Sequence, residues 1–187
     1  MSLKDKEKWD SKYSSEDHVI DRKPCSWLSE NAHFLPGQGQ ALELAMGEGR
    51  NAVFVAGLGY EVAGIDISET GLTHARKLAE EKKVNLKTIA ADLDFYELEK
   101  NNYNLILCFY FLNRNLFPKI KAALRPGGFF LCETFTVDHS KHSGLRREWL
   151  LEPNELLKAF SDFHIFNYRE VDQNEKAVAS LAGYKKK

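Results

Sequence analysis

The sequence predicts an α/β protein with a Rossmann-like, doubly wound sheet of about seven strands, mostly parallel, with an antiparallel C-terminal strand and helices on both faces. Three observations lead to this fold class. Short apolar runs alternate with segments whose apolar residues recur at helical spacing. A glycine-rich turn directly follows the first run. Near the end of the chain, a short polar turn joins two strand patterns, which makes these strands antiparallel.

The stretch ALELAMGEGRNAVFVAGLGYEVAGIDIS, residues 41–68, contains the first strand, a turn, a helix and the second strand. The apolar ALELA run is typical of a buried parallel strand, and two closely spaced glycines follow it. We expect a helix over Arg50–Leu58 and a second strand over Glu61–Ile67, with Asp66 near its end. A tight turn after one strand and a carboxylate after the next form a nucleoside-binding crevice in α/β sheets.

The rest of the chain continues the alternation of helix and strand. We expect helices from Ser68 or Glu69 to about Lys83, over Leu116–Leu124 and from Pro153 to Phe160, and strands over Leu86–Ala91, Tyr103–Phe111, Phe129–Phe135, His164–Val171 and Ala177–Tyr184. The polar turn Asp172–Glu175 joins the last two strands. A length of 187 residues, with neither a repeat nor a linker, predicts a single domain over residues 1–187.

Composition and charge limit the possible partners. The formal net charge is -1 at pH 7 and the one basic run is 185–187, so we expect no nucleic-acid partner. No apolar run reaches about 18 residues and the N-terminus is polar, so we expect neither a membrane span nor a signal peptide. The three cysteines are scattered, which predicts no metal site and a reducing, cytoplasmic setting. The oligomeric state is not predicted.

The glycine pattern of the turn separates two classes of nucleotide. A dinucleotide site requires G-x-G-x-x-G, because the pyrophosphate lies against bare backbone at the helix N-terminus. Here the sequence from Ala45 reads A-x-G-x-G-R-N. The third glycine of the dinucleotide motif would lie three residues after Gly49, and Ala52 occupies that position. Glu43 and Glu48 place carboxylates near the turn, where they suit an ammonium or sulfonium better than a pyrophosphate. The turn therefore favours S-adenosylmethionine over NAD.

The same segment resembles motif I of the class I S-adenosylmethionine-dependent methyltransferases, E/D-x-G-x-G-x-G. Glu43, Gly47 and Gly49 match this motif, and Ala45 replaces its first glycine. The stretch FYFLNRNLFPKIKAALRPGGFFLCETF, Phe109–Phe135, resembles the region after the motif. Its FLNR and RPGG elements, together with GEGRNA, are most similar to the tellurite-resistance-type small-molecule methyltransferases. The resemblance implies S-adenosylmethionine as cofactor and a small-molecule acceptor, with an oxyanion such as tellurite among the candidates.

The strand ends supply further candidate residues. We expect Asp66 to accept both ribose hydroxyls, with a helix N-cap as its alternative role. By the resemblance, Asp92 fits the adenine-contacting position beside Leu93, unless it is only a turn residue, and Phe109 lies on the far side of the cofactor or in the core. The predicted cofactor-binding residues are Tyr13, Arg22, Glu43, Ala45, Gly47, Gly49, Asp66, Ile67, Asp92, Leu93 and Phe109.

The resemblance also implies an N-terminal helical lid, residues 1–39, in front of a Rossmann-like core, residues 40–187. In this interpretation Tyr13 and Arg22 hold the carboxylate of the cofactor's methionine. Alternatively, Trp9 and Tyr13 are one helical turn apart and only pin an N-terminal helix.

Histidines and arginines gathered in one loop predict an anionic or oxyanion acceptor, with a solvated basic loop as the alternative. These residues are His139, His142, Arg146 and Arg147 in the loop Thr136–Leu151, with Tyr110 and Arg114 expected beside the acceptor. No catalytic residue is assigned, because the cofactor is already activated, and His139 or His142 is the expected base if one is needed. An NAD-dependent oxidoreductase and a non-catalytic nucleoside-binding module stay open as alternative functions.

Overall fold

The computed structural model describes residues 3–15 and 22–187. The chain forms two compact units, Met1–Leu98 and Glu99–Lys187. The strand order is β3-β2-β1 in the first unit and β4-β5-β7-β6 in the second, within the seven-stranded order β3-β2-β1-β4-β5-β7-β6. The expected α/β sheet is therefore present.

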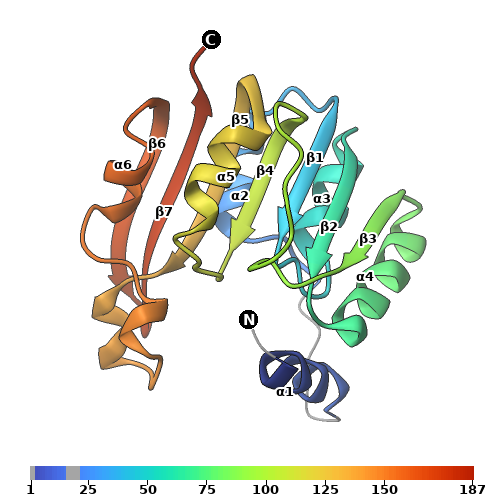
Figure 1. Ribbon diagram of the computed structural model, residues 1–187, viewed down its shortest axis with the longest axis horizontal. Helices are drawn as coiled ribbons and strands as arrows, with labels where there is room; N and C mark the ends of the chain where they lie inside the picture. The colour runs from blue at the N-terminus through green and yellow to red at the C-terminus, as the bar shows by residue number, and fades with distance from the viewer. Residues whose placement is uncertain (1–2, 16–21) are drawn as a thin grey trace. The chain divides into compact units, whose positions relative to one another are not determined.

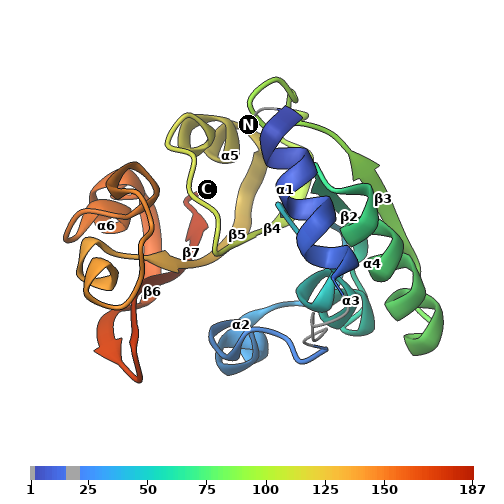
Figure 2. The same ribbon diagram turned by 90° about the horizontal axis from the view of Figure 1, so that it is seen from below.

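The first unit contains three parallel strands and the helices that follow them in the chain (Figure 1). Its elements are α1 (Leu3–Ser14), α2 (Ser26–Asn31), η1 (Ala32–Phe34), β1 (Gln40–Leu44), α3 (Arg50–Gly57), β2 (Glu61–Asp66), α4 (Glu69–Lys82) and β3 (Leu86–Ala90). Because β2 pairs in parallel with both β1 and β3, the carboxyl ends of all three strands lie at one edge. Figure 1 shows α1 beneath this edge, and Figure 2 shows it from below, near β2 and α4.

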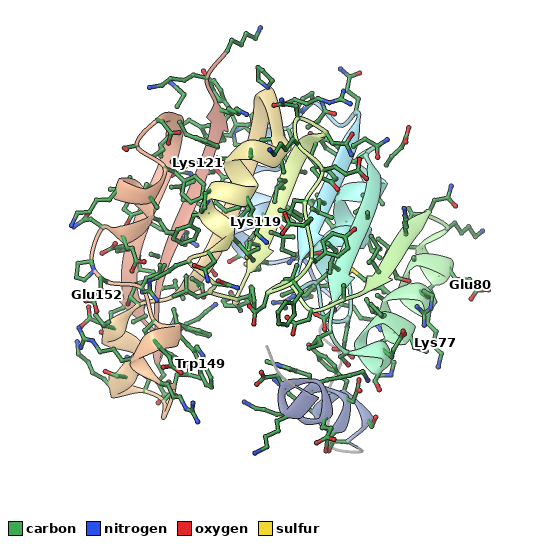
Figure 3. The ribbon with its side chains drawn as sticks, viewed as in Figure 1. Lys77, Glu80, Lys119, Lys121, Trp149 and Glu152 are labelled. Atoms are coloured by element: carbon green, nitrogen blue, oxygen red, sulfur yellow. The ribbon has the colours of Figure 1, made fainter. Side chains whose placement is uncertain are left out.

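Helices α3 and α4 pack side by side against this small sheet. Val53 of α3 packs with Leu78 and Ala79 of α4, and Val84 and Leu86 complete the cluster. The opposite side of α4 carries exposed charges, including Lys77 and Glu80, which are labelled in Figure 3. The 3.6-residue period of the sequence thus corresponds to a helix with one buried and one solvated side.

The second unit combines a parallel strand pair with an antiparallel hairpin. Its elements are β4 (Tyr103–Phe109), α5 (Leu116–Ala123), β5 (Leu124–Phe135), η2 (Val137–Lys141), η3 (Arg147–Trp149), α6 (Glu155–Ala159), β6 (Phe163–Gln173) and β7 (Lys176–Lys185). Strand β5 pairs in parallel with β4 and in antiparallel with β7, and β7 pairs in antiparallel with β6. The predicted antiparallel C-terminal strand is confirmed, and it lies between β5 and β6.

The alternating side chains of β5 face two different environments. Phe130 packs on Phe160, with ring centroids 4.6 Å apart, and Phe160 also contacts Phe117 of α5 at 5.4 Å. On the other face Phe129 contacts Phe166 and Tyr184 of the hairpin. Glu133 belongs to this second face, because residues two or four apart in a strand point the same way.

Several predicted boundaries differ from the structure for local reasons. Strand β4 ends at Phe109 rather than Phe111, because Tyr110 has a left-handed backbone with φ 55°. Strand β5 begins at Leu124, five positions before the predicted Phe129. The last helix begins at Glu155, after Asn154 with φ 59°, rather than at Pro153.

Three further findings concern the described residues, 3–15 and 22–187. No helix there is long and apolar enough to cross a membrane. In the same residues, no group of three His, Cys, Asp or Glu side chains could hold a metal ion. Cys25, Cys108 and Cys132 are free and buried.

Candidate functional site

The turn after β1 is built on left-handed backbone. Ala45, Gly47 and Gly49 have φ values of 52°, 55° and 76°, so the turn reverses direction within a few residues. The amide of Met46 donates to Ile65 O at 3.0 Å, which ties the turn to β2. The thioether of Met46 lies over Gly64, where a Cβ would be 1.9 Å from Sδ. The sequence A-M-G-E-G therefore forms a compact loop at the carboxyl edge of β1 and β2.

Asp66 lies between this turn and the start of α4. Its Oδ2 accepts from the amide of Gly47 at 2.8 Å, and its Oδ1 accepts from the amide of Ser68 at 2.9 Å. Ser68, not Asp66, is the N-cap of α4, because Ser68 Oγ accepts from the amide of Gly71 at 3.1 Å. The carboxylate is buried, which raises its pKa, while the amides of Ser68 and Gly47 act in the opposite direction. An ionised carboxylate has about four lone-pair sites, so Asp66 can accept a further hydrogen bond from a ligand hydroxyl.

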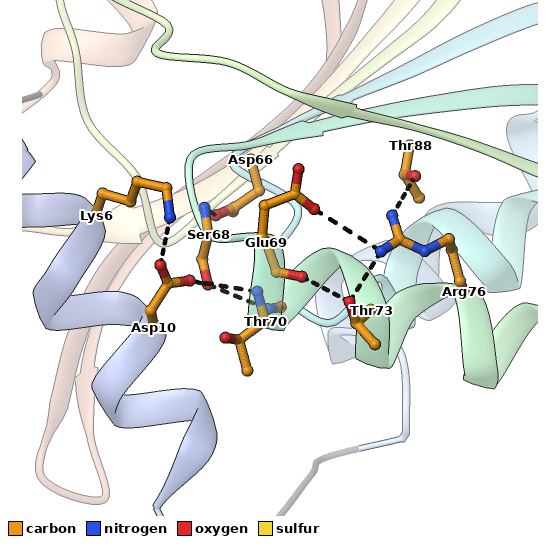
Figure 4. Close-up of polar contacts among 10 residues, drawn as sticks. Lys6, Asp10, Asp66, Ser68, Glu69, Thr70, Thr73, Arg76 and Thr88 are labelled. Atoms are coloured by element: carbon orange, nitrogen blue, oxygen red, sulfur yellow. Dashed lines mark hydrogen bonds and ion pairs between the residues drawn. The ribbon is translucent and has the colours of Figure 1, made fainter.

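Helix α1 is attached to the same place through Asp10. Ser68 Oγ donates to Asp10 Oδ1 at 2.6 Å, and the amide of Thr70 donates to the same oxygen at 3.3 Å (Figure 4). Lys6 Nζ lies 2.6 Å from Asp10 Oδ2. The hydrogen bonds from Lys6 and then from Ser68 lower the pKa of Asp10 to about 2. Asp10 therefore stays ionised and adds a second carboxylate near Asp66.

Tyr13 reaches the turn from the last part of α1. A Cβ on Gly47 would lie 2.7 Å from Tyr13 Oη, and one on Gly71 would lie 3.0 Å from Tyr13 Cε2. Burial and the nearby charge of Asp66 raise the pKa of Tyr13. Trp9 and Tyr13 also stack within α1, with ring centroids 5.7 Å apart. Tyr13 therefore lies at the glycine turn, as a lid residue would, and also makes the contact within the helix that the alternative interpretation expects.

Arg22 is not brought to the turn. Its guanidinium forms an exposed ion pair with Glu81, near the C-terminal end of α4, whereas the glycine turn lies at the N-terminal end of that helix. The expected pairing of Tyr13 with Arg22 around one carboxylate is therefore not seen in this structure.

Glu43 lies beneath the turn, within β1. Its Oε1 accepts from Asn51 Nδ2 at 2.9 Å, and Asn51 Oδ1 accepts from the amide of Cys25 at 2.8 Å. Burial raises the pKa of Glu43 to about 7. Among the described residues, Glu43 Oε2 is buried without a hydrogen-bond partner. Glu43 thus links β1, α3 and the segment before α2.

Asp92 and Leu93 follow β3 at the same edge. The amide of Ala91 donates to Asp66 O at 3.0 Å, which places this segment beside β2. Asp92 Oδ1 accepts from the amide of Asp94 at 2.9 Å, so Asp92 shapes its own turn. Leu93 is fully buried, Ile67 is half-buried and Phe95 is 82% exposed.

The chemistry of this edge fits a nucleoside that carries a positive charge. Asp10 and Asp66 surround the turn, and Glu48 lies beside it with its Oε1 2.7 Å from His74 Nδ1. These oxygens can accept hydrogen bonds from ribose hydroxyls and from an ammonium, and they would repel a pyrophosphate. At the position of the third dinucleotide glycine, Ala52 is fully buried in α3. The residues present therefore suit S-adenosylmethionine better than NAD.

In the second unit, a polar cluster forms where β4 ends. Phe109 is buried and pairs with Glu133 of β5. The amide of Tyr110 donates to Glu133 O at 2.7 Å, and its hydroxyl donates to Glu133 Oε1 at 2.6 Å. Ser180 Oγ donates to Glu133 Oε2 at 2.7 Å, and Lys176 Nζ and Arg169 Nη2 each lie 3.4 Å from this carboxylate.

The loop after β5 contains the short helices η2 and η3, and its two arginines face outward. His139 is buried and stacks on Phe135 at 4.1 Å; burial, and then His142 and Lys176, lower its pKa. His142 Nε2 lies 2.8 Å from Asp172 Oδ1. Exposed ion pairs join Arg146 to Glu148 and Arg147 to Glu152, and Arg114 braces the loop by donating to Glu148 O and Leu150 O.

Sequence reasoning did not single out Asp10, Glu133, Arg169, Lys176 or Ser180. A usable signal existed for Glu133, which is the one charged residue in the apolar run FFLCETF, just as Glu43 is in ALELA. For the other residues the contacts join positions far apart in the chain, and no local pattern marks them.

Comparison with known proteins supports the interpretation of the turn. Residues 41–128 match a family model described as a methyltransferase domain. The chain is 27% identical over 138 residues to the Haemophilus influenzae protein named "Probable S-adenosyl-L-methionine-dependent methyltransferase TehB". This match covers 70% of the chain and 48% of the relative, so the chain spans about half the length of that protein.

Solved structures share the fold. The crystal structure of TehB from Haemophilus influenzae superposes with a TM-score of 0.72 at 22% identity, over 97% of this chain and 67% of that one. An S-adenosylmethionine-dependent methyltransferase from Mesorhizobium loti gives a TM-score of 0.68 at 18% identity, over 86% of this chain and 98% of that one. Both likenesses concern the arrangement of strands and helices.

Proposed function

We propose that the chain is a class I S-adenosylmethionine-dependent methyltransferase, which transfers the methyl group of this cofactor to a small-molecule acceptor. The observation that carries the proposal is the position of Asp66. Its carboxylate is held by the amides of Gly47 and Ser68 at the edge where β1 and β2 end. This is the position from which a carboxylate binds ribose hydroxyls in α/β nucleoside sites.

In this proposal the chain's own residues bind and enclose the cofactor. Asp66 accepts hydrogen bonds from the ribose hydroxyls. The methionine moiety of the cofactor lies against the backbone of the turn residues Ala45, Gly47 and Gly49. Tyr13 covers the turn and limits the access of water. When bound, S-adenosylmethionine supplies a methyl group already activated as a sulfonium. The protein's contribution is then mainly orientation and exclusion of water, which are large effects in enzymes.

The remaining predicted cofactor residues have unequal support. Ile67 and Asp92 lie at the carboxyl ends of β2 and β3, as the assignment requires. Leu93 is fully buried, which fits a packing role below the adenine. Glu43 is proposed to hold the turn from beneath, because its contact with Asn51 reaches α3. Phe109 and Arg22 stay predictions: Phe109 is a buried strand residue, and Arg22 would have to leave Glu81.

We infer a small-molecule acceptor, with an oxyanion such as tellurite among the candidates, acted on within one catalytic domain. The three free, buried cysteines support a reducing, cytoplasmic setting.

A calorimetric titration with S-adenosylmethionine, S-adenosylhomocysteine and NAD tests this function. We expect both S-adenosyl compounds to bind in the micromolar range and NAD not to bind. Binding of NAD without either S-adenosyl compound would instead favour an oxidoreductase. Release of S-adenosylhomocysteine in the presence of a panel of small acceptors then separates an enzyme from a non-catalytic binding module.

A further inference from the structure

Glu133 is a carboxylate buried in the middle of an apolar strand, with 2% of its surface exposed. Four donors surround it: the hydroxyls of Tyr110 and Ser180, the ammonium of Lys176 and the guanidinium of Arg169. An ionised carboxylate is costly to bury unless such donors compensate it. The cluster therefore supplies the donors that a buried carboxylate at Glu133 requires.

The cluster contains more positive than negative charge. One cation would neutralise Glu133, and the cluster supplies both Lys176 and Arg169. Their side chains are 40% and 34% exposed, whereas Glu133 is buried, so the surplus charge lies on the solvent side. An ammonium has three donors, and the contacts of Lys176 Nζ with Tyr110 Oη and Glu133 Oε1 use two of them.

Tyr110 is fixed in an unusual backbone conformation. A φ of 55° is unfavourable for a residue with a side chain, at roughly 1–2 kcal/mol. The amide and hydroxyl of Tyr110 both bond to Glu133, and Lys176 Nζ lies 4.2 Å from the centre of its ring. Tyr110 directly follows β4, which runs parallel to β5, and the carboxyl ends of parallel strands are where α/β proteins bind ligands. Strain of this kind is typical of functional positions.

We propose that Lys176 and Arg169 bind the anionic group of the methyl acceptor, and that Glu133 and Tyr110 are positioning residues: Glu133 holds both cations, and Tyr110 accepts a hydrogen bond from Lys176. This inference rests on the proposed function and narrows its acceptor to a small carboxylate or oxyanion. The shared chemistry is an anionic oxygen, which can accept hydrogen bonds from both the ammonium of Lys176 and the guanidinium of Arg169. In this inference Lys176 and Arg169 bind the acceptor in place of Arg146 and Arg147, which are exposed and form ion pairs with Glu148 and Glu152.

Calorimetric titration with two simple anions tests the site. Sodium acetate and inorganic phosphate are titrated separately, each with and without saturating S-adenosylhomocysteine. We expect at least one anion to bind, and Lys176→Met to weaken its binding tenfold or more, as for the loss of a hydrogen bond to a charged group. Binding of acetate alone identifies a carboxylate acceptor and binding of phosphate alone an oxyanion. Lys158→Met, at an exposed lysine on α6, is the matched control and should bind like the wild type.

A double variant separates binding from a merely structural role. If Lys176 served only to neutralise Glu133, Lys176→Met with Glu133→Gln would recover both thermal stability and anion binding. Our proposal expects the melting temperature to recover while the anion affinity stays low. The proposal is overturned if neither anion binds the wild type, if Lys176→Met binds like the wild type, or if the double variant regains binding. Failure of S-adenosylhomocysteine to bind would instead contradict the proposed function, because the titrations without it test the anion site separately.

Discussion

The turns after β1 and β4 have similar backbone and opposite charge. Each begins with a non-glycine residue in the left-handed region, Ala45 with φ 52° and Tyr110 with φ 55°. Carboxylates surround the first turn, with Asp66 bonded to its backbone. Cations gather at the second turn, where Lys176 contacts the tyrosine itself. The comparison shows that side chains from neighbouring elements set the charge at each turn, while the backbone of the turn supplies its shape.

The two turns also differ in what holds them. At the first turn, glycines allow other elements to approach closely: a Cβ on Gly49 would lie 2.7 Å from Ala75 Cβ of α4. At the second turn, the side chain of Tyr110 is itself the contact, through its bond to Glu133. We therefore expect larger side chains to destabilise the first turn, and the loss of a side chain to destabilise the second.

The largest effect is expected for Gly49→Ala. The left-handed φ of 76° and the contact with Ala75 both oppose a side chain, so the free energy of unfolding should fall by roughly 2–4 kcal/mol. Urea denaturation measures this change. Gly57→Ala is the control, because Gly57 ends α3 with nothing within 4 Å of its missing Cβ, and alanine there should stabilise by about 0.5–1 kcal/mol. Equal losses in the two variants would contradict the close approach of α3 and α4.

The next effect is a pH dependence that originates in the buried carboxylates of the first turn. Burial raises the pKa of Glu43 from 4.5 to about 7 and also raises that of Asp66. Between these pH values the folded state binds more protons than the unfolded state, so stability falls as the pH rises from about 4.5 to about 7. Glu43→Gln should remove on the order of 2–3 kcal/mol of this decline, measured by urea denaturation across that range. Glu80→Gln, on the exposed side of α4, should keep the wild-type slope, and an unchanged slope in Glu43→Gln would show that Glu43 titrates normally.

Asp66→Ala should weaken the binding of S-adenosylhomocysteine by roughly 1.5–3 kcal/mol, because hydrogen bonds to a charged group are lost. This is about ten- to a hundredfold in affinity, measurable by calorimetry. Asp66→Asn should lose less, since its amide oxygen still accepts a hydroxyl. Asp162→Ala, at an exposed carboxylate paired with Lys121, should bind like the wild type. If folded Asp66→Ala also bound like the wild type, the carboxylate would serve the turn alone.

The smallest effect is expected for Arg146→Ala and Arg147→Ala. Both side chains are exposed and form ion pairs with acidic residues nearby in the sequence, and such pairs contribute about 0–1 kcal/mol. The unfolding free energy and the rate of methyl transfer should both stay close to the wild-type values. A loss of turnover without a loss of stability in either variant would indicate that this loop binds the acceptor. It would then contradict the assignment of the acceptor to the turn after β4.

The fold was predictable because its signals are local. The apolar run before Gly47, the helical spacing after Gly49 and the polar turn before Lys176 each lie within a few residues. The ends of elements were less predictable, since β4 stops where Tyr110 adopts a left-handed backbone, and many residues other than glycine can do so when the surroundings fix them.

The candidate site was predictable only in part. Asp66 follows a strand at a recognisable interval from the glycines, and the structure places it against Gly47. The contact of Asp10 with Ser68 joins residues 58 positions apart, and that of Tyr110 with Lys176 joins residues 66 positions apart. Long-range side-chain contacts of this kind depend on the completed fold, and short sequence patterns do not encode them.

The packing of Met46 over Gly64 has a spectroscopic consequence. The sequence contains two methionines, Met1 and Met46, so a carbon-13 label on methionine methyl groups gives one internal resonance. Met46 stands between Ala45 and Gly47, and its thioether is confined against β2. A ligand that shifts the turn would move this single resonance, so occupancy of the turn could be followed without a chromophore or an assay of turnover.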